Sequence, residues 1–182
     1  MIKMLLHTCC APCLSGMHTA LLSDDVRITG YFFNPNIHPQ EELENRVNAL
    51  KVYSSAKKLD AVIIEEYDLD LFRKEVVDKP GERCSNCYSL RLEATAHFAK
   101  ENGYECFSTT LLISPYQRHD LVKAAGIAAS RKYGIGFYYD DLRGFYPDSV
   151  RISRQMGIYR QKYCGCFVSM EERNEQVSFA SR

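Results

Sequence analysis

Cysteine falls into three tight groups along this chain, and this placement constrains the fold more than any other feature. The groups read C-C-x-x-C, C-x-x-C and C-x-C and contain seven of the eight cysteines: Cys9, Cys10, Cys13, Cys84, Cys87, Cys164 and Cys166. Closely spaced thiolates bind one ion or cluster with little loss of chain entropy, and they select zinc, copper(I) or iron–sulfur centres. The groups therefore predict a fold that brings three distant segments together around metal.

The number of thiols limits the kind of centre. A structural zinc site needs four ligands, so seven exceed it. One 4Fe-4S cluster also takes four cysteines, which leaves three for a second metal or for a redox-active dithiol. The eighth cysteine, Cys106, stands in the apolar stretch ECFSTTLL and is expected to be a core or strand residue.

Apolar strands and amphipathic helices alternate along the chain. Strands are expected at residues 3–8, 26–34, 61–67, 104–112 and 136–140. Helices are expected at residues 11–23, 41–59, 69–77, 86–102 and 115–133, with helical pieces from Ser149 onward. This alternation predicts one α/β domain over residues 1–182, with a parallel sheet and helices on both of its faces. Sites in such sheets lie outside the carboxyl ends of the strands, where Cys9 follows the first strand, so the three groups are expected to meet there.

Hydropathy and charge give weaker indications. No apolar stretch reaches the length of about 18 residues that indicates a membrane span. The start of the sequence lacks the apolar length of a secretory signal, so we expect a cytoplasmic protein. The formal net charge is zero, and this total neither predicts nor excludes a nucleic-acid partner.

Candidate catalytic side chains accompany the cysteine groups. His7 precedes the first group and Tyr88 follows the second, while Asp140 and Asp141 end the last predicted strand. Each of the four could donate a proton, and the two aspartates could instead be metal ligands or turn residues.

Candidate substrate-binding side chains lie in two stretches. Arg91 follows the C-x-x-C group and could pair with an anionic cluster or a phosphate. Ser114 is expected to cap a helix that begins at Pro115 and carries Tyr116 and Gln117; such a helix start can hold a phosphate or an extruded base, although capping alone also explains the serine.

The segment that leads into the third cysteine group alternates basic and aromatic residues. Its cations are Arg143, Arg151, Arg154, Arg160 and Lys162. Basic side chains neutralise phosphates and tyrosines stack on unpaired bases, although a solvated face with half-buried tyrosines has the same composition. Its position next to Cys164 favours a polyanionic substrate presented to the metal.

Five stretches taken together resemble the QueH type of epoxyqueuosine reductase: LLHTCCAPC, YFFNPNIHP, GERCSNCYSLRLEATA, FSTTLLISPYQ and YRQKYCGCFVS. The resemblance runs from about Met4 to Ser169. It implies a Rossmann-like three-layer sandwich of the adenine nucleotide alpha hydrolase-like kind with a helical C-terminal segment. It also implies the last step of queuosine biosynthesis, a cobalamin-independent, two-electron reductive deoxygenation of epoxyqueuosine to queuosine in tRNA.

The resemblance further implies a 4Fe-4S cluster with an adjacent mononuclear iron, held by the seven grouped cysteines. It leaves open which cysteines bind which metal. Because adjacent side chains of an extended chain diverge, Cys9 and Cys10 are expected to point apart and serve different metals. The stretch DDLR has leucine where the family pattern leads us to expect an aromatic residue before Arg143, which leaves open whether Asp140 or Asp141 approaches the metal.

The expected partners are tRNA, through epoxyqueuosine in its anticodon loop, and a low-potential electron donor that the sequence does not identify. Two other functions stay open. One is a tRNA sulfur-transfer or nucleotide-binding enzyme on a similar fold, which the absence of a glycine-rich phosphate loop after the first strand disfavours. The other is a zinc-stabilised binding module without catalytic activity.

Overall fold

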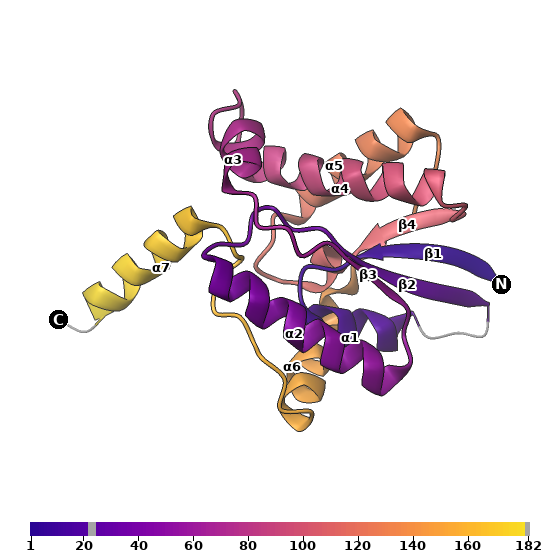
Figure 1. Ribbon diagram of the computed structural model, residues 1–182, viewed down its shortest axis with the longest axis horizontal. Coiled ribbons are helices and arrows are strands. Elements are labelled where there is room, and N and C mark those ends of the chain that lie inside the picture. The colour runs from indigo at the N-terminus through magenta and orange to yellow at the C-terminus, as the bar shows by residue number, and fades with distance from the viewer. Residues whose placement is uncertain (22–24, 181–182) are drawn as a thin grey trace.

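Among residues 1–21 and 25–180, which the computed structural model describes, a five-stranded parallel sheet lies between two layers of helices (Figure 1). The elements follow in this order: β1 (Ile2–His7), α1 (Ala11–Ala20), β2 (Val26–Phe32), α2 (Gln40–Lys57), β3 (Ala61–Ile63), α3 (Leu69–Phe72), η1 (Arg73–Val77), α4 (Arg83–Glu101), β4 (Cys106–Thr109), η2 (Thr110–Ile113), α5 (His119–Tyr133), β5 (Gly136–Phe137), η3 (Leu142–Phe145), α6 (Tyr146–Gln155) and α7 (Phe167–Ala180). The α/β fold expected from the alternating pattern is confirmed.

The sheet has the strand order β3-β2-β1-β4-β5, and β1 is its central strand. His7, the last residue of β1, pairs with Tyr31 of β2 on one side and with Thr109 of β4 on the other. Leu5 and Leu6 are completely buried, as expected for a parallel strand covered on both faces. The chain leaves β1 toward β2 but later returns to add β4 on the opposite side. A crevice opens at such a reversal, outside the carboxyl ends of the strands.

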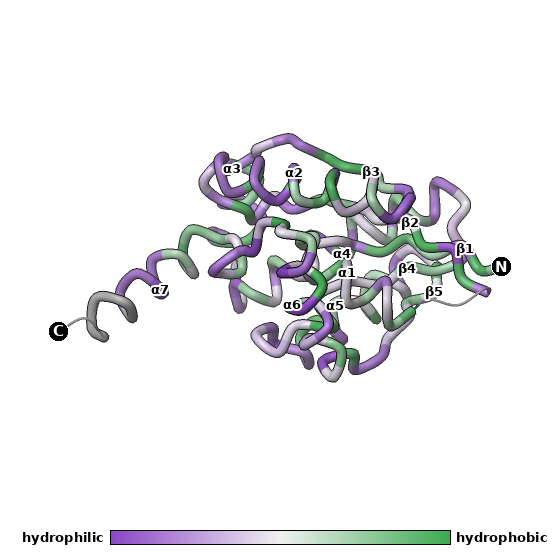
Figure 2. The backbone as a smooth tube through the Cα atoms, turned by 90° about the horizontal axis from the view of Figure 1, so that it is seen from below, coloured by the Kyte–Doolittle hydropathy of each residue, from purple (hydrophilic) through white to green (hydrophobic). Residues whose placement is uncertain are grey.

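Helices cover both faces of the sheet. Figure 1 shows α4 and α5 on one face and α1, α2 and α6 on the other, with α4 packed on α5 and α1 packed on α6. Figure 2 shows hydrophobic residues running along β1, β2 and β3. Fully buried Leu14 of α1, Leu50 of α2, Leu92 of α4 and Val122 of α5 fill the space between sheet and helices.

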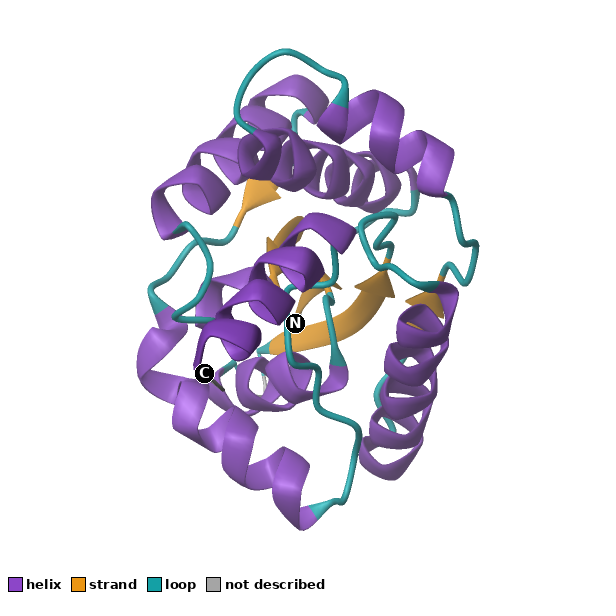
Figure 3. Cartoon of the chain, turned by 90° about the vertical axis from the view of Figure 1, so that its left-hand side faces the viewer, coloured by secondary structure: helices purple, strands orange, loops and turns teal. Residues whose placement is uncertain are grey.

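The C-terminal helix α7 stands apart from these layers. It projects from the body in Figure 1, and Figure 3, which faces the carboxyl ends of the strands, shows it in front of the sheet. The expectation of separate helical pieces in the C-terminal segment is confirmed by α6 and α7. No helix in the described part of the chain is long and apolar enough to cross a membrane.

Several boundaries differ from those expected. The predicted helix at Pro115 is wrong: α5 begins at His119, with Arg118 at the N-cap position. Between β4 and α5 lies the 3-10 helix η2, at whose start the Thr109 hydroxyl accepts a hydrogen bond from the Leu111 N–H. Ser114 therefore ends η2 instead of capping α5, and its Oγ accepts from the Tyr116 N–H at 3.3 Å.

Other boundaries shift without changing the topology. The strands expected to run to residues 67, 112 and 140 end at Ile63, Thr109 and Phe137. The helix expected at residues 69–77 divides into α3 and the π-helical turn η1. The helix expected at 11–23 ends at Ala20, and residues 22 and 23 lie outside the described residues.

Candidate metal centre

The central strand delivers the first cysteine group to the carboxyl edge of the sheet. Cys9 follows β1, Cys10 is the N-cap residue of α1, and Cys13 lies in the first turn of that helix. Their three Sγ atoms lie within 4.8 Å of one another, and all three side chains are buried. The expectation that Cys9 and Cys10 point apart is wrong, because their Sγ atoms are only 3.7 Å apart. The chain turns into α1 here, so the alternation of a strand does not continue.

The second group lies at the start of α4. This helix begins at Arg83, three residues before the expected Asn86, and so it contains both Cys84 and Cys87 among its first five residues. Residues three apart in a helix share one face. Both side chains are half-buried.

The third group lies between α6 and α7. The Sγ atoms of Cys164 and Cys166 are 3.7 Å apart, with Cys164 exposed and Cys166 buried. Cys166 directly precedes α7, and its Sγ accepts a hydrogen bond from the Ser169 N–H at 3.4 Å. The Ser169 Oγ lies 3.0 Å from the Sγ of Cys164.

One cavity of about 560 Å³ joins the three groups. The thiol-bearing residues in its wall are Cys9, Cys13, Cys84, Cys87, Cys164 and Cys166. Cys10 lies behind this wall in contact with Cys9. The structure thus brings together all seven grouped cysteines, whereas Cys106 lies at the start of β4 outside the cavity lining.

The sulfur geometry fits a thiolate-bound metal. Two thiolates on a tetrahedral ion with metal–sulfur bonds of about 2.3 Å are roughly 3.8 Å apart, and the Cys9–Cys10 and Cys164–Cys166 separations are both 3.7 Å. All eight cysteines, each within the described residues, are free thiols. The donor set therefore suits zinc, copper(I) or an iron–sulfur centre.

The surroundings of Cys9 and Cys164 favour the thiolate. Hydrogen bonds from Cys10 and Cys13 hold the pKa of Cys9 well below its usual value, and the Thr110 hydroxyl, 3.2 Å from the Cys9 Sγ, acts in the same direction. The Cys166 thiol lowers the pKa of Cys164 to about 5. In addition, every group lies at the N-terminus of a helix, α1, α4 or α7, where the positive end of the helix dipole stabilises negative sulfur. The neighbouring thiols keep their protons. Burial raises the pKa of Cys10 and Cys87, and hydrogen bonds with the neighbouring sulfurs raise the pKa of Cys13 and Cys166.

Two buried arginines face this collection of sulfurs. Arg91 of α4 is 3% exposed, and its Nη1 donates to the Asn34 Oδ1 at 3.4 Å. Arg46 of α2 is 1% exposed and also lines the cavity. Positive charge held without access to water is costly unless anions accompany it. Arg46 has a buried partner in Glu42, 2.7 Å away, whereas no carboxylate among the described residues pairs with Arg91, so Arg91 indicates a negatively charged occupant or wall.

The remaining predicted site residues divide into two sets. Those that line the cavity are Tyr88, Arg91, Ser114, Tyr116, Gln117 and Arg160. Those that do not are His7, Asp140, Asp141 and Arg143.

The second set has other partners. His7 is completely buried in β1 with its Nδ1 2.8 Å from the Thr109 Oγ1, and burial lowers its pKa to about 3. Asp141 forms an exposed ion pair with Arg143, and Asp140 accepts the backbone N–H of Asp141 at 2.7 Å.

Three polar cavity residues that the sequence did not reveal lie close to the cysteine groups: Asn36, Arg46 and Gln161 are among the lining residues. The Gln161 Nε2 lies 2.9 Å from the Cys10 Sγ and so touches the first cysteine group directly. The sequence does contain a pattern that indicates a buried role for Arg46. This arginine falls on the same stripe of α2 as buried Leu43, Val47 and Leu50, and an arginine on an inward-facing stripe calls for a buried anion or acceptor.

Comparisons with known proteins agree with this geometry. The family model described as epoxyqueuosine reductase QueH matches residues 4–172. The epoxyqueuosine reductase QueH of Dehalococcoides mccartyi is 36% identical over 171 residues, which cover 94% of each chain. That of Thermotoga maritima is 37% identical over 188 residues, covering 98% of this chain and 95% of the relative.

Among solved structures, the zinc-inhibited form of teicoplanin deacetylase Orf2 aligns with a TM-score of 0.45 and 8% identity, over 74% of this chain and 65% of that one. Identity above one third along nearly the whole chain, together with the family-model match, shows that this chain belongs to the epoxyqueuosine reductase QueH family.

Proposed function

We propose that this chain removes the epoxide oxygen of epoxyqueuosine in tRNA and so completes queuosine, without cobalamin. In the balanced reaction the substrate gains two electrons and two protons, both C–O bonds of the epoxide break, a carbon–carbon double bond forms, and the oxygen leaves as water. The supporting observation is the single cavity in which thiols from three distant segments meet, in a member of a family named for this reduction.

A 4Fe-4S cluster and an adjacent mononuclear iron are the proposed cofactors, held by the seven grouped cysteines. One cluster needs four cysteines, and the compact triad of Cys9, Cys10 and Cys13 supplies a further three-sulfur group. When bound, these iron centres supply the electrons and a Lewis acid for the departing oxygen. An external low-potential donor must renew the electrons.

Tyr88 is the proposed proton donor. Of the four candidates it alone lines the cavity, whereas His7, Asp140 and Asp141 do not. Its hydroxyl donates to the Gln117 Oε1 at 2.9 Å, and burial raises its pKa to about 12, so the phenol keeps its proton at neutral pH. A group that holds a proton beside the reacting oxygen can deliver it as the C–O bond breaks.

The cavity dimensions bear on how a tRNA is presented. A volume of about 560 Å³ lies within the range of small-molecule sites and holds one modified base but not an RNA loop. The base must therefore leave its stack and enter the cavity, as in other enzymes that act on a nucleobase. Ser114 and Gln117 in the wall offer polar groups to it.

The cavity mouth suits the flanking nucleotides. Tyr116 is 79% exposed and meets the ring of Tyr146 edge-on, with centroids 5.7 Å apart. Arg160 and Lys162 also line the cavity, and within the described part of the chain neither forms an ion pair. Exposed tyrosine stacks on unpaired bases and unpaired cations bind phosphates, so these residues would hold the anticodon loop while the reacting base is inside.

The test is anaerobic incubation of iron-loaded protein with epoxyqueuosine-containing tRNA and a low-potential reductant, followed by mass analysis of the nucleosides. We expect loss of one oxygen mass. Cys84→Ser should abolish conversion, whereas Cys106→Ser, which alters a thiol outside the cavity lining, should retain it. Unchanged epoxyqueuosine in the presence of fully loaded protein would reject the proposal, and purification with stoichiometric zinc and no iron would favour a binding module.

A further inference from the structure

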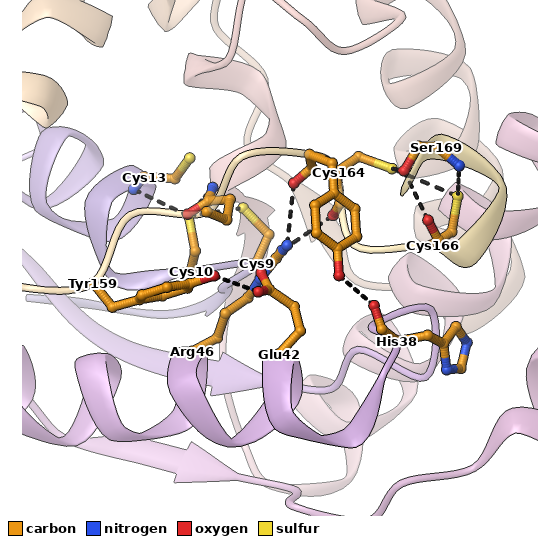
Figure 4. Close-up of polar contacts among 12 residues, drawn as sticks. Cys9, Cys10, Cys13, His38, Glu42, Arg46, Tyr159, Cys164, Cys166 and Ser169 are labelled. Atoms are coloured by element: carbon orange, nitrogen blue, oxygen red, sulfur yellow. Dashed lines mark hydrogen bonds and ion pairs between the residues drawn. The ribbon is translucent and has the colours of Figure 1, made fainter. Parts of the chain in front are cut away.

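A buried arginine ties the third cysteine group to helix α2. The Arg46 Nη1 and Nη2 donate to the carbonyl oxygens of Cys164 and Tyr163, each at 3.1 Å, and its Nε donates to the Glu42 Oε1 at 2.7 Å. All three guanidinium nitrogens are therefore engaged. Figure 4 shows Arg46 rising from the helix between the first cysteine group and the loop that carries Cys164.

Other contacts fix the same loop from the same direction. The Tyr163 hydroxyl donates to the His38 carbonyl, and the His38 N–H donates to the Gly165 carbonyl at 2.8 Å. Gly165 is also packed closely, because a Cβ built there would lie 3.3 Å from the Arg46 Nη1. Three successive residues, 163 to 165, are thus held by contacts with residues 38 and 46, and Arg46 makes two of the hydrogen bonds.

The charge of Arg46 faces the sulfurs. Arg46 lines the cavity but Glu42, its ion-pair partner, does not. The Tyr159 hydroxyl donates to the second oxygen of Glu42, which holds the carboxylate on the side away from the lining. The positive end of the pair therefore points at the thiols. A buried charge interacts strongly over short distances because water does not screen it.

We infer that Arg46 is a positioning residue for the metal centre: its contacts with the Tyr163 and Cys164 carbonyls hold the loop that presents the third cysteine group to the metal, and its charge stabilises the more negative, reduced form of that centre. The inference rests on the proposed function, because it requires a reducible thiolate-bound centre. Arg46 would make two contributions: its guanidinium fork orients the loop, and its charge acts on the potential of the centre. Different substitutions remove these contributions, because lysine keeps the charge but lacks the fork.

The test compares Arg46→Gln, Arg46→Lys and Arg27→Gln after anaerobic reconstitution with iron and sulfide. Arg27 forms an exposed ion pair with Asp60 and serves as the control. Readouts are iron and sulfide per chain and the midpoint potential of the centre. We expect Arg46→Gln to lose occupancy and to shift the potential to more negative values. Arg46→Lys should also lose occupancy, since it lacks the fork, but should keep a potential near that of the wild type.

Occupancy and potential equal to those of the wild type in Arg46→Gln would overturn the inference. Should this variant fail to fold because Glu42 is left without its partner, the double variant Arg46→Gln/Glu42→Gln removes the buried pair together. It carries the same expectation for occupancy and a smaller negative shift of the potential, because the pair has no net charge and only its positive end lines the cavity. These readouts need no RNA. Failure of the loaded wild type to convert epoxyqueuosine would therefore reject the proposed reaction while leaving the role of Arg46 to be decided by the potentials.

Discussion

Gly165, between the two cysteines of the third group, gives a sharp test of how that loop is held. Its φ of +125° lies where residues with a side chain are rarely found. An added Cβ would lie 3.1 Å from the Asn36 Nδ2 and from the Ile37 Cγ1, and 3.3 Å from the Arg46 Nη1. Replacing Gly165 with alanine therefore adds both backbone strain and crowding.

The size of the effect follows from these two terms. Strain at such a position costs about 1–3 kcal/mol, and crowding of a packed site costs about 1–3 kcal/mol where the neighbours cannot shift. Alanine also lowers the entropy of the unfolded chain, which stabilises the folded protein by about 0.4–1 kcal/mol. We expect a net loss of about 3 kcal/mol in the free energy of unfolding. In a domain of this size each kcal/mol lowers the melting temperature by about 2–4 °C, so the expected decrease is about 6–12 °C.

The assay is thermal unfolding of the metal-free protein, followed by circular dichroism with thiol reductant and chelator present. Two matched controls separate the terms. Gly144 has no neighbouring atom within 4 Å and no positive φ, so Gly144→Ala should melt with the wild type. Gly103 has a φ of +72° in open space, so Gly103→Ala reports strain alone. If Gly165→Ala melts within error of Gly144→Ala, the loop is not held as described and the reasoning fails.

Four further predictions concern the site and its acid sensitivity. Tyr116→Ala should weaken binding of an anticodon stem-loop by about 1–3 kcal/mol through lost stacking; fluorescence anisotropy at fixed salt measures this, and unchanged affinity would remove Tyr116 from the RNA interface. Tyr88→Phe should lower turnover about 10²- to 10⁴-fold at unchanged iron content, and normal turnover would exclude Tyr88 as the proton donor. Burial lowers the pKa of His38 from 6.5 to about 4, so below about pH 6.5 the unfolded chain binds a proton that the folded chain does not, and the free energy of unfolding falls as the pH drops toward 4. Urea unfolding of the metal-free protein at several pH values should show a smaller fall for His38→Phe than for the wild type. An equal fall in both would assign the loss to other groups. Removing bound metal should lower the melting temperature because three distant segments lose shared ligands, a prediction contradicted by equal melting of the loaded and metal-free forms.

Much of the fold could be predicted from local sequence patterns. The buried run that became β1, and the alternation of strands with helices, were sufficient to predict a parallel sheet with the first cysteines at its carboxyl edge. Helix and strand boundaries were harder to predict. Ser114 and Pro115 resemble the start of a helix in the sequence, but Ser114 ends η2 and its Oγ accepts from the Tyr116 N–H, so α5 begins only at His119.

The site residues that are clustered along the sequence could be predicted from it. Those whose role depends on contacts between distant segments could not. Cysteine spacing identified the sulfur ligands as a set. Nothing local in the sequence links Arg46 to the carbonyl oxygens of Tyr163 and Cys164, which lie 117 and 118 positions further along. The expected divergence of Cys9 and Cys10 failed for a related reason, since the rule for strands does not apply where a helix begins.

The cysteine side chains of the site differ in their exposure to solvent. Cys9, Cys10 and Cys13 are shielded by the body of the protein, whereas Cys164 is exposed on a connecting loop and ionises readily. Oxygen and metal chelators in solution therefore reach the Cys164 thiolate before they reach the buried thiols of the first group. We therefore expect oxidation by air to begin at the C-terminal side of the site, while the three buried thiols of the first group remain reduced.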